Sequence, residues 1–242
     1  MSVPRVSVVI PAYNEGESIR RCLDRILTAV HIPCEVLVVF DRPEDTTAEP
    51  ARAYASQDPR VVPLLNYRQP GPAGAIRCGI EAASAAVVVV TMADGSDEPA
   101  QIEDLTRRVE EGASVAAASR YMAGGHQLGG PLLKGLMSRT AGVSLWALAG
   151  VGTHDATNSF KAYSKAFIDK VGIESSAGFE IGIELVAKAR RGGGQVVEIP
   201  TIWKDRTEGQ SNFKAAQWIP RYLHWYLVAL LPGYGKWRPY KG

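Results

Sequence analysis

The stretch Val87–Pro99, VVVVTMADGSDEP, joins a hydrophobic run to an acidic loop. Four consecutive valines predict a strand that is buried on both faces. Pro99 suits the first turn of a helix, because a backbone N–H is not needed there. Asp94, Ser96 and Asp97 then lie at the carboxyl end of a strand, where open α/β sheets bind ligands. Such hard oxygen ligands favour Mg²⁺ or Mn²⁺, whereas the alternative is a turn in which Asp97 only caps a helix.

Strand and helix patterns alternate on both sides of this stretch. Asn14, with Glu17 three residues later, predicts a capping box at the start of the first helix. The alternation predicts an α/β fold with a mostly parallel central sheet and helices on both faces. The expected strands are Arg5–Ile10, Glu35–Phe40, Val61–Leu65, Val87–Met92, Ser114–Ser119 and Gln195–Pro200, and the main intervening helices are Ile19–Val30, Ala48–Ser56, Ala75–Ala83, Ala100–Glu111 and Gly178–Arg191.

Two apolar segments stand out in the second half of the chain. Pro131–Val151 is rich in Leu, Met, Trp and Ala and includes Lys134 and Arg139. This composition fits a core helix, and it also fits a helix on a membrane surface. Phe213–Leu231 predicts a helix that is apolar almost all round and must therefore be covered. Its Trp and Tyr residues are of the type that prefers lipid headgroups.

The composition limits the class of protein. The chain has 242 residues, 46% of them hydrophobic, and a formal net charge of +2. This charge does not indicate a nucleic-acid-binding protein. Three cysteines without metal-ligand spacing predict reduced thiols in a cytoplasmic protein. The sequence begins directly with a strand rather than a signal peptide, and it contains no apolar stretch of the length that spans a bilayer.

The loops of the first half carry a series of short motifs. Pro11-Ala12-Tyr13-Asn14-Glu15 follows the first strand, Asp41 follows the second, Gly71–Gly79 opens the third helix, and Ala93-Asp94 follows the fourth strand. In this order they resemble the family 2 inverting glycosyltransferases of the GT-A fold. The motifs of the second half resemble the branch of the dolichyl- or polyprenyl-phosphate mannose synthases, and they are Ser119-Arg120-Tyr121, Gly124-Gly125, Ser138-Arg139, Asp155–Lys161, Gly178–Glu184, Glu198-Ile199-Pro200, Asp205-Arg206 and Gly209-Gln210-Ser211.

The resemblance implies a division of the chain. Residues 1–212 would form a GT-A domain with a donor half, 1–119, and an acceptor half, 120–212. Residues 213–242 would form a C-terminal apolar helix and tail. The resemblance also implies a binding site for the donor nucleotide sugar. In that site Asp94 would be a metal ligand, helped by Ser96 or Asp97. Met92 occupies the first position of the usual Asp-x-Asp pair. The implied nucleotide-binding residues are Pro11, Tyr13, Glu15, Asp41, Gly74 and Arg77.

On the acceptor side, the resemblance implies a lipid phosphate. Such a phosphate needs cations and hydrogen-bond donors to position it, because it is already a nucleophile near neutral pH. Asp155 would orient an arginine or the acceptor, or would act as a base if the acceptor were a hydroxyl. Glu180 and Glu184 are four residues apart and share a helix face. The resemblance implies that this helix borders the site, and the alternative role of the two acids is only to hold arginines in place. The candidate phosphate ligands are Arg120, Arg139, Arg206, Ser138 and Ser211.

The resulting expectation is a metal-dependent, inverting hexosyltransferase with Asp94, Asp155, Arg120 and Arg206 as its catalytic residues. It would use a GDP- or UDP-sugar donor and a polyprenyl or dolichyl phosphate acceptor. Its apolar segments would dock on the cytoplasmic face of a membrane or on a membrane-anchored partner. The alternatives are a soluble family 2 enzyme with a hydroxyl acceptor, and a non-catalytic protein that binds nucleotide sugars.

Overall fold

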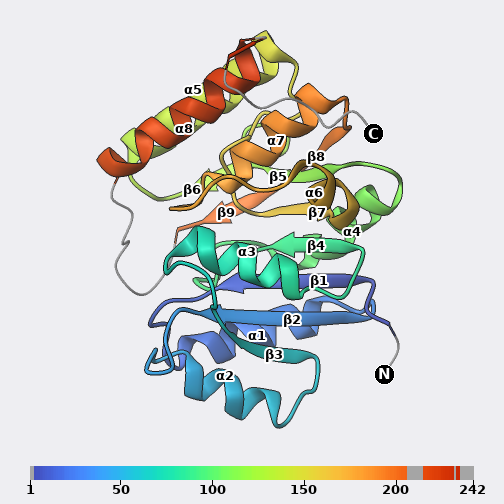
Figure 1. Ribbon diagram of the computed structural model, residues 1–242, viewed down its shortest axis with the longest axis vertical. Coiled ribbons are helices and arrows are strands. Elements are labelled where there is room, and N and C mark those ends of the chain that lie inside the picture. Colours follow the sequence, from blue (N-terminus) through green and yellow to red (C-terminus); the bar gives the residue numbers. More distant parts are fainter. Residues whose placement is uncertain (1–2, 206–214, 232, 235–242) are drawn as a thin grey trace.

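A seven-stranded sheet forms the centre of the computed structural model, which describes residues 3–205, 215–231 and 233–234 (Figure 1). The strand order is β3-β2-β1-β4-β7-β5-β8, and helices cover both faces. Strand β7 runs antiparallel to its neighbours β4 and β5, whereas the other pairings in this sheet are parallel. The strands are β1 (Val6–Pro11), β2 (Cys34–Phe40), β3 (Val61–Leu65), β4 (Val87–Val90), β5 (Val115–Ser119), β7 (Lys161–Ser164) and β8 (Val196–Pro200).

Two hydrophobic cores lie on the two faces of the sheet. Alternate residues of each strand serve opposite faces, so Val8 and Val89 join one core and Val9 and Val88 the other. Helices α1 and α4 cover the first face, and α3, α7 and α8 cover the second. The helices are α1 (Ser18–Ala29), α2 (Ala48–Ala55), α3 (Pro72–Ala82), a 3₁₀ turn (Pro99–Gln101), α4 (Ile102–Glu110), α5 (Leu132–Ala149), α6 (Lys165–Val171), α7 (Ile181–Gly192) and α8 (Ala215–Leu230).

A small second sheet is formed by two short strands that follow β5 and β8 along the chain. It pairs β6 (His126–Leu128) in parallel with β9 (Ile202–Lys204). The Lys204 N–H donates to the Ser96 carbonyl at 3.2 Å. The acidic loop after β4 is therefore tied directly to the strand that leads into the last part of the chain.

The predicted α/β class is confirmed, and two local expectations are corrected. Strand β7 was not predicted, because KAYS is short and begins with a lysine rather than with an apolar run. The capping box is wrong: α1 begins at Ser18, Glu17 is its N-cap, and that cap makes no side-chain hydrogen bond. Asn14 instead has φ 54°, in the left-handed region, and belongs to the loop before the helix.

Helices α5 and α8 lie side by side at one end of the molecule (Figure 1). Helix α8 buries Trp225 and Val228 against the core, so the apolar segment is covered on one side. The outer face of α5 is open, with Leu132 91%, Leu133 71% and Leu136 63% exposed. Within the described residues, no helix combines the length and the hydropathy that crossing a bilayer requires.

Candidate active site

Hydrogen bonds within the acidic loop after β4, and one from helix α1, fix its conformation. Asp97 is buried, and its Oδ2 accepts hydrogen bonds from the Thr91 hydroxyl at 2.9 Å and from the Met92 N–H at 3.1 Å. The Arg25 guanidinium of α1 donates to the Gly95 carbonyl at 2.6 Å. These contacts fix the backbone that carries Asp94 at the carboxyl end of β4.

The charges of this loop make a place for a cation. Asp94 is half-buried, and its Oδ1 accepts the Ser96 N–H at 3.1 Å. Burial raises the pKa of Asp97 to about 6, and the nearby charge of Asp94 acts in the same direction. A divalent ion would relieve this repulsion. Among the described residues no group of three or more His, Cys, Asp or Glu could hold a metal ion by itself.

The loop after β1 is held by the loop after β2. Both carboxylate oxygens of Asp45 accept the Asn14 N–H, at 3.0 and 3.2 Å, and the Thr47 hydroxyl accepts the Glu15 N–H at 3.0 Å. Tyr13, which directly precedes Asn14, is 59% exposed. The phenol of Tyr13 is thus presented at the sheet edge on a fixed backbone.

Asp41, at the end of β2, organises the segment before α3. Its Oδ1 accepts the Asn66 amide at 2.8 Å, and its Oδ2 accepts the Gly71 N–H at 2.7 Å. At Gly74 an added Cβ would lie 1.7 Å from the Gln69 carbonyl oxygen, so glycine is required there by the packing of α3 on this segment. Both residues therefore have structural partners within the protein in addition to their predicted role toward the donor.

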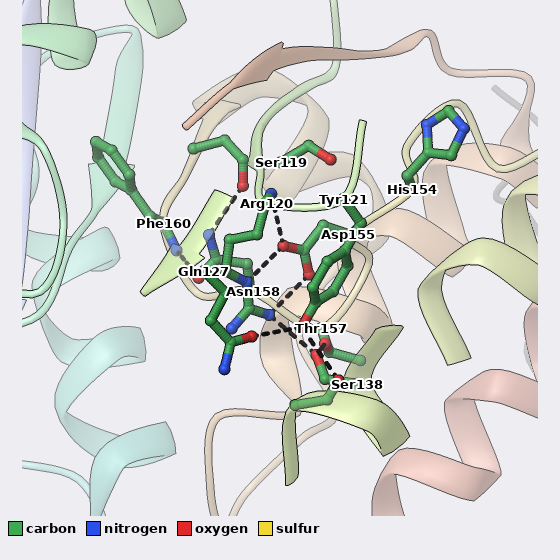
Figure 2. A network of polar contacts seen from close by, with 12 residues as sticks. Ser119, Arg120, Tyr121, Gln127, Ser138, His154, Asp155, Thr157, Asn158 and Phe160 are labelled. Atoms are coloured by element: carbon green, nitrogen blue, oxygen red, sulfur yellow. Dashed lines mark hydrogen bonds and ion pairs between the residues drawn. The ribbon is translucent and has the colours of Figure 1, made fainter. Parts of the chain in front are cut away.

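The residues that were predicted for the acceptor side are centred on an ion pair between Arg120 and Asp155 (Figure 2). Nε and Nη2 of Arg120 donate to the two carboxylate oxygens at 2.7 and 2.9 Å, and the Arg120 backbone N–H donates at 3.0 Å. The Asp155 side chain is fully buried and that of Arg120 is 11% exposed. Burial alone would lower the pKa of Arg120, but the charge and hydrogen bonds of Asp155 outweigh it and raise that pKa.

Helix α5 joins this pair through Ser138. The Ser138 hydroxyl accepts Arg120 Nη2 at 2.9 Å and lies 2.6 Å from the hydroxyl oxygen of Thr157. The Arg120 guanidinium also stacks over Tyr121, 4.8 Å from the ring centroid, and lies 6.0 Å from that of Trp203. Because every one of these contacts restrains Arg120, its guanidinium is held in a single orientation.

A second link between α5 and the sheet involves His154. Its Nδ1 lies 2.6 Å from Glu198 Oε1, and its ring stacks on Trp146 with the centroids 4.0 Å apart. In Figure 2 His154 points away from Arg120, so it supports the helix rather than the ion pair. An added Cβ at Gly142 would lie 2.1 Å from the His154 carbonyl oxygen, which shows how closely α5 approaches this loop.

Comparison with known proteins identifies the family. The model of "Glycosyl transferase family 2" matches residues 7–172, more than half of the chain. The chain belongs to glycosyl transferase family 2. Polyprenol monophosphomannose synthase from Mycolicibacterium smegmatis is 33% identical over 233 residues, which cover 88% of this chain and 86% of that protein. Dolichol-phosphate mannosyltransferase from Pyrococcus furiosus is 32% identical over 213 residues, a match that covers 87% of this chain and 59% of that protein.

Solved structures support the fold of this family 2 glycosyltransferase. Glucosyl-3-phosphoglycerate synthase from Mycobacterium tuberculosis, in complex with Mn²⁺, UDP and glucosyl-3-phosphoglycerate, superposes with a TM-score of 0.70. The two proteins are 19% identical, and the match covers 95% of this chain and 81% of the other. A further structure of the same synthase contains Mg²⁺ and UDP. The predicted GT-A fold is therefore confirmed.

In the glycosyltransferase, the sequence-predicted residues lie in different parts of the structure. Pro11 is the last residue of β1, and Tyr13, Glu15, Asp41 and Asp94 follow the carboxyl ends of β1, β2 and β4, which share one edge of the sheet. Arg120, Ser138 and Asp155 meet around the ion pair, whereas Arg139 is exposed on α5 and Arg77 donates to the Ser175 carbonyl at 3.4 Å. The predicted Arg206 and Ser211 lie outside the described residues.

The two glutamates near α7 do not hold arginines among the described residues, which corrects that expectation. Glu184 is fully buried, lies 2.7 Å from the Lys188 ammonium and accepts the N–H groups of Glu174 and Ser175. Glu180 accepts the Ala177 N–H through Oε1 at 3.3 Å. Its buried Oε2 has no hydrogen-bond partner in the described structure.

Several residues of the site were missed by sequence reasoning. Thr157 lies inside a quoted motif, but its contact with Ser138 depends on a helix 19 residues away. Lys161, also within that motif, is fully buried, and burial lowers its pKa to about 7. Asp45 resembles a surface acid in the sequence, and Glu198 lies inside another quoted motif, but only their long-range partners reveal their contacts.

Proposed function

We propose that this glycosyltransferase moves a hexosyl group, with inversion, from a GDP- or UDP-sugar to a polyprenyl or dolichyl phosphate. The observation that carries the proposal is the half-buried cluster of Arg120, Asp155, Ser138 and Thr157, here called the acceptor cluster, at the sheet edge that also bears the acidic loop. The names of the relatives support it, because they are mannosyltransferases that act on polyprenyl-type phosphates. The implied sugar is mannose.

The donor half would hold the nucleotide diphosphate. Tyr13 and Glu15 would face the nucleoside, and Asp94 with Ser96 would hold a Mg²⁺ or Mn²⁺ against the diphosphate. When bound, the ion neutralises the leaving diphosphate and acts as a Lewis acid. Arg25 keeps the loop in place through the Gly95 carbonyl, so the carboxylate of Asp94 does not have to reorganise when substrate binds.

The acceptor phosphate would supply the nucleophile. An oxygen of the phosphate attacks the anomeric carbon, a new C–O bond forms, and the bond to the diphosphate breaks with its electrons leaving on the nucleotide. A phosphate monoester has a second pKa of about 6, so no strong base is needed. Arg120 has its charge balanced by Asp155 and would orient the acceptor through one edge of its guanidinium. The exposed Arg139 and the predicted Arg206 would add the positive charge.

A hydroxyl acceptor would require a general base, and Asp155 does not have the geometry of one. Both its oxygens accept hydrogen bonds from Arg120, and its side chain is fully buried. A carboxylate in this setting positions an arginine and cannot reach a solvent-borne hydroxyl. The lipid phosphate is therefore the better acceptor.

The location that we propose is the surface of an anionic membrane, on the cytoplasmic side. Helices α5 and α8 together carry exposed Leu132, Leu136 and Leu223 and contain no acidic residue in the ranges described. Lys134 and Arg139 add positive charge to α5. Apolar side chains combined with basic ones match the interface of an anionic bilayer.

The test is a transfer assay with the purified full chain, Mn²⁺ and a panel of nucleotide sugars. We expect transfer to polyprenyl phosphate, with loss of most turnover in Asp94→Ala and little loss in Asp104→Ala, a surface carboxylate on α4. Glycosylation of a soluble alcohol in place of polyprenyl phosphate would contradict the proposed acceptor. Full turnover of Asp94→Ala would contradict its assignment to the metal.

A further inference from the structure

Lys161 is a buried cation that the transfer chemistry described above does not use. Its side chain is fully buried at the start of β7, in the middle of the sheet. Its ammonium donates to the backbone carbonyls of Asn158 and Ala156, the latter at 3.2 Å. Among the described residues no carboxylate lies within ion-pair distance of it, so the two carbonyls are its direct partners. Burying a charge is costly unless the charge is hydrogen-bonded or paired, and burial accordingly lowers the pKa of Lys161 to about 7.

The two carbonyls belong to the loop that presents the acceptor cluster. Asp155 precedes them and Thr157 lies between them, so one ammonium holds the backbone on both sides of Thr157. The Asn158 side chain fixes the same loop from the sheet, donating to the Ala118 carbonyl at 2.8 Å. The amino end of α7 closes the remaining side, because an added Cβ at Gly182 would lie 3.0 Å from the Asn158 oxygen and 3.5 Å from the Lys161 nitrogen.

The position of Lys161 in the sheet explains how its side chain can hold the 155–158 loop. Strand β7 is inserted between β4, which leads to the acidic loop, and β5, which leads to Arg120. Lys161 is paired with Val90 on one side and with Ala117 on the other. Both neighbouring strands thus fix the backbone of Lys161. Its side chain in turn fixes the 155–158 loop through the two carbonyl groups.

We propose that Lys161 is a positioning residue for the acceptor: it sets the backbone of the 155–158 loop and thereby places Asp155 against Arg120 and Thr157 against Ser138. The inference rests on the proposed function, because it assigns Lys161 to the acceptor half of that site. It leaves the donor half independent of Lys161, since the loops after β1 and β2 are held by Asp45 and Asp41 instead.

The experiment compares Lys161→Met with Lys165→Met in the full chain. Lys165 is the matched control, because its ammonium also donates to a buried carbonyl, that of Ile80 at 2.9 Å, but away from the acceptor cluster. We expect Lys161→Met to lower kcat/KM for polyprenyl phosphate about 10²-fold, as misplaced reacting groups do, with an increase in the KM of the acceptor. The KM of the donor and the affinity for a nucleoside diphosphate with Mn²⁺ should stay within about twofold.

A purely structural role would give a different result. It would lower the melting temperature and the folded fraction of Lys161→Met but leave both KM values unchanged, and that outcome would overturn the proposal. Lys161→Gln is measured in parallel, since its N–H donors are retained without charge, and it should recover part of the acceptor KM. In combination with Thr157→Val, the losses should be less than multiplicative, whereas multiplicative losses would also refute the coupling. If the wild-type chain does not use polyprenyl phosphate at all, the proposed function fails before Lys161 is tested.

Discussion

Replacing Asp155 by asparagine should cost the protein much of its stability as well as its activity. Arg120 makes three hydrogen bonds to this carboxylate, two from its guanidinium and one from its backbone, and all are shielded from water. In Asp155→Asn the shape is preserved, but Arg120 is left as a buried charge without a counter-ion. Breaking a buried ion pair in this way costs about 3–5 kcal/mol. For a chain of this size, that loss corresponds to a melting temperature about 6–20 °C lower.

The matched control is Asp104→Asn on α4. Its carboxylate lies 2.5 Å from Arg107, but both side chains are more than half exposed. Surface pairs of this kind contribute about 0–1 kcal/mol, so the control should unfold close to the wild-type temperature. Both variants are followed by thermal and urea unfolding with tryptophan fluorescence, and by transfer assays below the melting temperature. If Asp155→Asn unfolds within about 1 kcal/mol of the wild type, or no differently from the control, the buried pair does not have the role given to it here.

Three further changes test other parts of the structure. Burial raises the pKa of Asp97 to about 6, above its unfolded value, so the native metal-free protein binds the extra proton and loses stability as the pH rises from about 4 to 6. Asp97→Asn should flatten that slope in urea titrations with EDTA, and an unchanged slope would contradict the assignment. Gly142→Ala places a Cβ 2.1 Å from the His154 carbonyl oxygen, so it should lower the free energy of unfolding by about 1–3 kcal/mol and quench or shift Trp146 fluorescence. The control Gly135→Ala places its Cβ only against the end of the Gln127 side chain and should change both quantities little. Leu136→Glu should reduce sedimentation with anionic liposomes, whereas Leu65→Glu, on β3 at the opposite edge, should not; equal binding of both variants would remove the membrane assignment.

The fold was predictable because its main elements have strong local signals. Four valines in β4 leave little choice but a buried strand, and Pro99 marks the turn that follows the acidic loop. Strand β7 has no such signal, since it is four residues long and its first side chain is a lysine. Its position depends on two neighbouring strands, which sequence periodicity does not reveal.

The edge of the sheet that carries the predicted site residues could be predicted, but the contacts of those residues could not. The carboxyl ends of β1, β2 and β4 share one edge, so the loops that carry Tyr13, Asp41 and Asp94 were expected there. Which partner each side chain takes depends on residues far along the chain. Asp41 holds Asn66 and the Gly71 N–H, and Arg120 is 35 residues from the carboxylate that neutralises it. Local patterns carry no information on such pairs.

The antiparallel insertion of β7 also affects how the chain is made. Strands β1 to β4 are complete once Val90 has left the ribosome, but β7 is the strand that pairs with the far side of β4, and it begins at Lys161. Until then, the valine-rich edge of β4 has no partner and exposes unpaired N–H and C=O groups. Chains of domain size expose such edges while they are still incomplete, and those edges favour aggregation. A nascent chain stalled between residues 91 and 160 is therefore the form of this protein that most needs a chaperone.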